Sequence, residues 1–107
     1  MEAEIKNACK GILQAYEAGL LSDRYRQAVR AAQETVGTGY TATAAPERAK
    51  LTRAVTLNLI NRRQYPYDKL RALYGLTVGK RKFEEEKAVF CAVLAEKIGM
   101  IEAEEKD

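Results

Sequence analysis

The stretch "LYGLTVGKRKFEEEK", Leu73 to Lys87, holds two glycines four residues apart, then three consecutive bases and three consecutive acids. Apolar residues before Gly75 favour a short helix, glycine permits a turn, and Thr77 is a residue type that commonly caps a following helix. The stretch therefore predicts a helix, a turn and a second helix, the order found in helix-turn-helix proteins that bind DNA. The same residues also fit an ordinary helix start with a solvated charged face.

Apolar residues recur at helical spacing in every segment outside the loops, and no strand pattern is present. This predicts an all-α fold, a small single domain of about five helices with a C-terminal helix-turn-helix-like unit. The expected helices are residues 3–18, 23–36, 46–62, 66–74 and 77–98. The domain would consist of an N-terminal helical hairpin (1–36), a loop (37–46), a part that contains the helix-turn-helix (47–99) and an acidic tail (100–107).

The last expected helix contains an apolar run of eight residues, Ala88 to Ala95. An amphipathic surface helix would show polar residues within such a run. We therefore expect this helix to be covered on more than one side, either centrally within the domain or by a second copy of the chain. A homodimer is the corresponding prediction for the oligomeric state.

Basic residues are concentrated in one segment of the chain. Residues 48–82 carry ten bases against one acid, a net charge of +9, whereas residues 1–47 have a net charge of −1 and residues 83–107 of −5. A local excess of this size predicts a patch for a polyanion, with double-stranded DNA as the expected partner. The alternative is that the charges only keep a small helical protein soluble. The candidate DNA contacts are Thr77, Lys80, Arg81, Lys82, Arg62, Arg63, Lys69 and Arg71.

The start of the last helix gives these candidates different roles. Its two lysines would contact phosphates near the free N–H groups, and Arg81 would reach a guanine edge in the major groove. The acids Glu84 to Glu86 would lie away from phosphate and pair with Arg62, Arg63 or Lys87.

Two positions depart from the common helix-turn-helix pattern. Arg71 stands where a small residue is usual, and Arg81 stands where a buried residue is usual, with the apolar Phe83 two residues later. Either the turn is longer than usual or the two helices pack at another angle.

The residues from Tyr67 to Gly99 resemble the C-terminal helix-turn-helix of ArpU-like phage transcriptional regulators, which is itself similar to the fourth region of sigma factors. The resemblance rests on the apolar-Gly-Leu-Thr turn, the spacing Phe83-x-x-x-Lys87-x-x-Phe90 and the ending "LAEKIG", and it covers about the last third of the chain. It implies transcription regulation in a phage or mobile element. It also implies that four residues meet DNA, namely Thr77, Lys80, Arg81 and Lys82.

The chain lacks residues and motifs that several classes of protein need. Histidine, the common acid or base at neutral pH, is absent, and no phosphate-binding loop or cofactor motif is present, so we expect no enzyme and no cofactor. Cys9 and Cys91 are far apart in sequence without CxxC spacing, which predicts two buried reduced thiols rather than a disulfide or a metal site. No apolar run approaches the roughly 20 residues of a membrane span, and the N-terminus does not resemble a signal peptide. These features predict a soluble cytoplasmic protein.

Two functions fit this description. The first is a DNA-binding helix-turn-helix regulator. The alternative is a small helical protein-interaction module, a phage-type inhibitor or adaptor, whose basic segment meets an acidic protein surface. They differ in salt response, because phosphate binding releases counterions and weakens steeply with salt.

Overall fold

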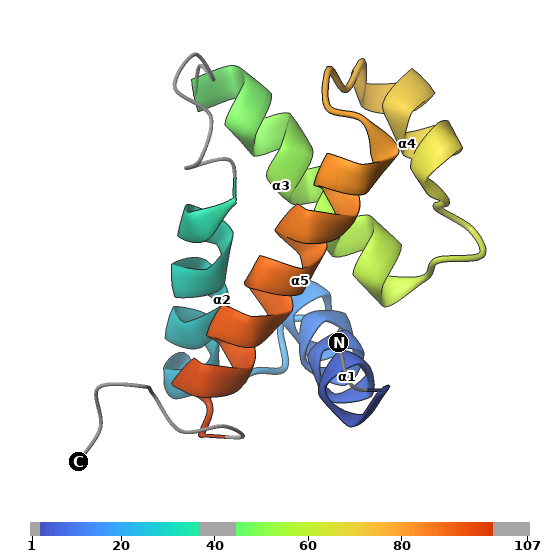
Figure 1. The fold of residues 1–107 in the computed structure, drawn as a ribbon. Coiled ribbons are helices and arrows are strands. Elements are labelled where there is room, and N and C mark those ends of the chain that lie inside the picture. Colours follow the sequence, from blue (N-terminus) through green and yellow to red (C-terminus); the bar gives the residue numbers. More distant parts are fainter. Residues whose placement is uncertain (1–2, 37–44, 100–107) are drawn as a thin grey trace.

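The computed structural model describes residues 3–36 and 45–99, and within these ranges it contains helices and no strand. The five helices, shown in Figure 1, are α1 (Ala3–Glu17), α2 (Asp23–Thr35), α3 (Ala45–Ile60), α4 (Tyr67–Tyr74) and α5 (Lys80–Lys97). The predicted all-α fold of five helices is confirmed, and each helix end lies within three residues of its expected position. The expected acidic tail (100–107) lies outside the described residues, as does the expected loop (37–46) apart from its last two residues, which belong to α3.

The central element is α5, which packs against α2, α1 and α3. In Figure 1 it crosses the molecule between α2 and α4, with α1 below it. Its buried side chains include Phe83, Phe90 and Leu94, none of which has measurable solvent exposure. The run from Ala88 to Ala95 is therefore covered mainly by the chain's own helices. Three residues of that run remain exposed on its outer side, Ala88, Val89 and Ala92.

The end of α4 follows the sequence expectation. Gly75 has a φ of 64°, in the left-handed region that favours glycine, and its N–H donates to the carbonyl oxygen of Arg71. Leu76, directly after it, is buried in the common core with Leu70 of α4. The turn therefore leads the chain back over the core toward the start of α5.

A buried polar contact fixes α5 on α3. Lys87 of α5 is 2% exposed, and its Nζ donates to Oδ1 of Asn58 on α3 at 2.7 Å. Asn58 in turn donates through Nδ2 to the carbonyl oxygen of Tyr65 at 2.8 Å, and Glu84 lies 3.1 Å from the ammonium. Because a buried charge must be paired, this network allows few other positions of α5 along α3.

Candidate nucleic-acid interface

The helix that carries the candidate DNA contacts begins later than the sequence predicts. Its N-cap is Gly79, with extended backbone at φ −75° and ψ 170°, and the first N–H···O bond runs from Phe83 to Gly79 at 2.9 Å. The expectation that Thr77 caps this helix is wrong, and Thr77 lies exposed in the turn. The physical reason is a tertiary contact, since the hydroxyl of Tyr67 donates to the carbonyl oxygen of Val78 at 2.6 Å and holds the chain outside the helix there.

The segment between α4 and α5 therefore has five residues, Gly75 to Gly79. The turn is thus three residues longer than the expected Gly75-Leu76 turn. Phe83 is buried and its ring packs at a tilt of 57° against Tyr67 with ring centroids 5.3 Å apart, whereas the Arg81 side chain is 95% exposed. Arg71, the other departure, is also exposed, so neither arginine is forced into the core.

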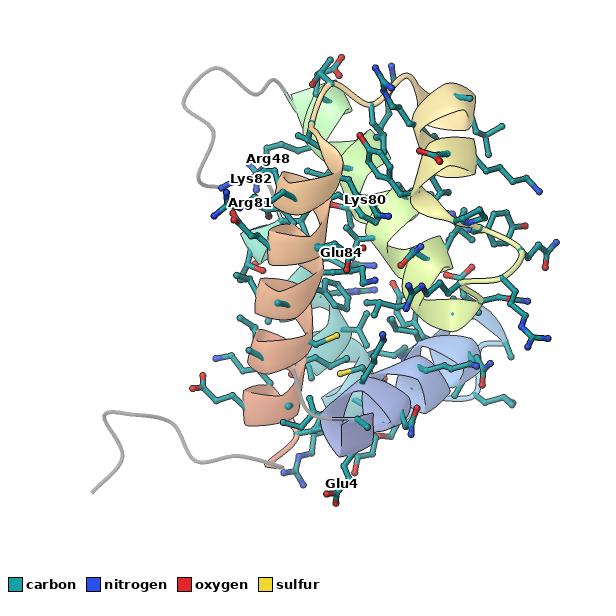
Figure 2. All side chains as sticks on the ribbon, turned by 45° about the vertical axis from the view of Figure 1, so that its right-hand side comes forward. Glu4, Arg48, Lys80, Arg81, Lys82 and Glu84 are labelled. Atoms are coloured by element: carbon teal, nitrogen blue, oxygen red, sulfur yellow. The ribbon has the colours of Figure 1, made fainter. Side chains whose placement is uncertain are left out.

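Three consecutive bases, Lys80, Arg81 and Lys82, form the first turn of α5, and we refer to them as the α5 basic cluster. Figure 2 shows Arg81 and Lys82 on the side of α5 where Arg48 lies, and Lys80 on the opposite side, above Glu84. The cluster therefore presents charge on two sides of the helix start.

Glu85 lies against this cluster. Its carboxylate oxygens are 3.6 Å from Nε of Arg81 and 3.5 Å from Nζ of Lys82. The sequence predicted Arg62, Arg63 or Lys87 as partners of the acids. Glu85 instead pairs with Arg81 and Lys82, because residues three and four apart share one face of a helix. Glu84 pairs with Lys87, one of the partners expected, and Glu86 is buried.

The position of the cluster has an electrostatic consequence. The N-terminal end of a helix is the positive end of its dipole, where bases are disfavoured and anions are stabilised. The first turn of α5 contains no acid, whereas those of the other four helices contain Glu4, Asp23, Glu47 and Asp68. Because the N-cap residue is glycine, it has no side chain to bond the first N–H groups. The start of α5 is thus suited to bind an anion.

The other candidate contacts lie elsewhere on the surface. Arg62 and Arg63 are exposed in the segment between α3 and α4, and the ammonium of Lys69 lies 5.3 Å from the ring centre of Tyr65. Figure 2 shows that segment at the right-hand edge of the molecule and Arg81 with Lys82 at the left. Arg62 and Arg63 therefore lie apart from Arg81 and Lys82, so the eight candidates do not form one patch.

An open groove of about 590 Å³ lies along α4 and the turn that follows it. It is lined by Asp68, Arg71, Ala72, Gly75 and Leu76. The one acid of the basic segment thus lies beside Arg71, which lowers the attraction of this groove for phosphate.

Two bases of the segment make contacts within the fold that the sequence did not predict. Arg48 donates to the carbonyl oxygens of Val36 at 3.2 Å and Glu34 at 3.0 Å, so it caps the C-terminal end of α2. Arg53 pairs with Glu17 of α1 at 2.9 Å, and this hydrogen bond is the main cause that raises the pKa of Arg53. Both contacts join distant segments, so no local pattern signals them.

The described part of the chain shows no group of three or more histidine, cysteine or acidic residues placed to hold a metal ion. None of its helices has the length and apolar character needed to cross a membrane. Comparisons of the chain with protein-family models, curated proteins and solved structures found no match.

Proposed function

We propose that this chain is a cytoplasmic DNA-binding protein of the helix-turn-helix type, a transcription regulator of a phage or mobile element and not an enzyme. In this proposal α4 is the first helix of the motif and α5 is the recognition helix. The observation that carries the proposal is the α5 basic cluster, three consecutive bases at the positive end of a helix whose first turn has no acid.

The roles within the cluster follow from exposure and chemistry. Lys80 and Lys82 contact phosphates as point charges, and the first N–H groups of α5 favour the same anions. Arg81 extends fully into solvent and can reach the O6 and N7 atoms of a guanine. Thr77 lies exposed in the turn before the helix and is suited to a phosphate oxygen.

The bases outside the α5 basic cluster fix the orientation of the protein on the duplex. Arg62, Arg63, Lys69 and Arg71 are exposed, and they bind the sugar-phosphate backbone beyond the recognition helix. Such contacts fix orientation without reading sequence.

A second copy of the chain is part of the proposal, because helix-turn-helix proteins commonly read two half-sites as dimers. The surface proposed for this contact is the exposed strip of α5 formed by Ala88, Val89 and Ala92.

One observation favours the alternative, a protein-interaction module that binds an acidic protein surface. Glu85 lies within 4 Å of both Arg81 and Lys82, and a mixed-sign surface suits a protein partner better than a phosphate backbone. Two measurements distinguish these functions. Affinity for DNA should fall steeply with salt, and non-specific duplex should compete for the DNA-binding site.

The test is a titration of the protein with random-sequence duplex at two salt concentrations. Binding that weakens steeply with salt supports the DNA function. The double variant Lys80→Ala, Lys82→Ala should weaken binding to all duplexes alike and flatten the salt slope by up to about two units. The variant Arg81→Ala should bind duplexes of different defined sequence with equal affinity.

The matched control is Lys97→Ala, which removes an exposed base from the other end of the same helix and should leave binding unchanged. Circular dichroism confirms that each variant keeps its helices. If the wild-type protein binds no duplex at low salt, the DNA function is wrong and the acidic protein partner takes its place.

A further inference from the structure

Two cysteines that lie 82 positions apart in the chain meet in the core. Cys9 of α1 and Cys91 of α5 are both fully buried. The sulfur of Cys9 lies 3.6 Å from the carbonyl oxygen of Cys91, at the contact between the two helices. Their burial agrees with the sequence expectation, but their contact was not expected, because the pairing depends on how α1 and α5 pack.

The two thiols also affect each other's protonation. The Cys9 thiol donates to the carbonyl oxygen of Cys91. A hydrogen bond with the Cys91 side chain lowers the pKa of Cys9, and burial acts in the opposite direction. The same hydrogen bond and burial raise the pKa of Cys91, while the ammonium groups of Lys87 and Lys6 act in the other direction. Cys9 is therefore the first of the two to form a thiolate, and Cys91 is the cysteine beside it in the core.

We propose that Cys9 and Cys91 form a dithiol site, which a peroxide oxidises to an intramolecular disulfide that joins α1 to α5. The proposal is independent of DNA binding. It rests on the contact that places the sulfur of Cys9 3.6 Å from the backbone of Cys91, and it requires a small oxidant because both side chains are buried.

The chemistry has two steps. The Cys9 thiolate attacks one oxygen of hydrogen peroxide, the O–O bond breaks, and a sulfenic acid forms with release of hydroxide, which takes up a proton to become water. The Cys91 thiol then attacks the sulfur of Cys9, the S–O bond breaks, and the leaving hydroxide takes the proton of the Cys91 thiol to become a second water. Two thiols and one peroxide thus give one disulfide and two waters.

The geometry sets the requirements for closure. A disulfide needs the two sulfur atoms about 2.05 Å apart, which is closer than a thiol hydrogen bond. The disulfide therefore requires rotation about the Cα–Cβ bonds and an approach of α1 toward α5. Because peroxide must reach a buried site, oxidation should depend on transient opening of α1, and its rate should level off as the peroxide concentration rises.

The experiment treats the reduced full-length chain with hydrogen peroxide and measures its intact mass. The expected product is a monomer lighter by two hydrogen atoms, and dithiothreitol should restore the original mass. Trypsin cleavage after lysine should then give Asn7–Lys10 joined to Ala88–Lys97 by a disulfide. The thermal midpoint of the oxidised monomer should be at least about 5 °C higher, since the bond closes a long loop.

The matched controls are Cys9→Ala and Cys91→Ala, neither of which should yield the linked peptides or lose hydrogen as a monomer. If a control variant fails to fold, the linked peptides from the wild-type chain still decide the matter. The proposal is overturned if peroxide leaves the folded protein unchanged, only adds oxygen atoms to the thiols, or links cysteines of two different chains.

Discussion

Glu85 is three and four residues from two bases of the α5 basic cluster, and this spacing brings its carboxylate close to both. Arg81 is almost fully exposed and about half of the Glu85 side chain is in solvent, so these ion pairs add little to folding stability. The carboxylate nevertheless reduces the positive potential at the start of the helix. Its effect on an approaching anion should therefore exceed its effect on the fold.

We predict that Glu85→Gln raises affinity for random duplex about threefold at low salt and changes the free energy of unfolding by less than about 0.5 kcal/mol. A fluorescence titration and a urea unfolding curve measure the two effects. The control is Glu4→Gln, which changes the net charge equally at the opposite end of the molecule in Figure 2. An equal rise in duplex affinity in both variants would contradict a local effect of Glu85.

The buried contact between Lys87 and Asn58 should be a larger source of stability. Asn58→Ala leaves the ammonium without its 2.7 Å partner and leaves the carbonyl of Tyr65 without a donor, and we expect a loss of about 2–4 kcal/mol in unfolding free energy. Lys87→Met removes the charge that needs pairing and should cost less. In urea unfolding, the two changes combined should cost less than their sum, and strict additivity would show that the two side chains are not coupled.

At the scale of elements, the start of α5 shows where sequence reasoning fails. Thr77 has the residue type and spacing of an N-cap, yet the helix begins three residues later than predicted, at Lys80. The deciding contact is the hydrogen bond from Tyr67 to the carbonyl of Val78, which links α4 to the turn. Local propensity carries no information about such a contact, so the helix was predictable and its cap was not.

Substitutions at Gly79 test whether the N-terminal end of α5 binds phosphate. Its φ is in the range of any residue, and a Cβ at this position would meet no atom within 4 Å. Gly79→Asp should therefore add a capping carboxylate and stabilise the fold by about 0.5–1.5 kcal/mol. The same carboxylate would occupy the N–H groups proposed for phosphate, so duplex affinity should fall.

Gly79→Ala is the matched variant, because it adds the Cβ without the carboxylate. Its duplex affinity should equal that of the wild-type chain. If Asp and Ala variants bind duplex equally well, the start of α5 is not the phosphate site. Thermal unfolding followed by circular dichroism reports the stability of both.

At the scale of the whole molecule, the sequence predicted which helix lies in the core, but it did not predict which basic residues make contacts within the fold. The apolar run from Ala88 to Ala95 indicated a covered helix, and α5 is the element on which α1, α2 and α3 pack. Charge counting found the basic segment, but it could not separate Arg81 in solvent from Arg48, which holds the end of α2. These differences arise from contacts between distant segments, which periodicity within one helix does not encode.

The oligomeric state is testable at this scale. We expect light scattering to show a dimer at about 100 μM protein, since the dissociation constant of a functional dimer should be lower than this. Val89 is 48% exposed on the proposed contact strip, and Val89→Glu should give a monomer because it places two like charges in the interface. A wild-type monomer under these conditions would contradict the proposed dimer.

The length of α5 has a practical consequence for fluorescence work. Its 18 residues separate the basic cluster from Lys97 by about 25 Å, in a molecule with extents of 40 × 30 × 25 Å. Since Cys9 and Cys91 are fully buried, a maleimide dye should react first with a cysteine introduced at the exposed position of Lys97. A donor dye at that position would show energy transfer to an acceptor on a bound ligand. The dye itself would lie away from the proposed binding surface.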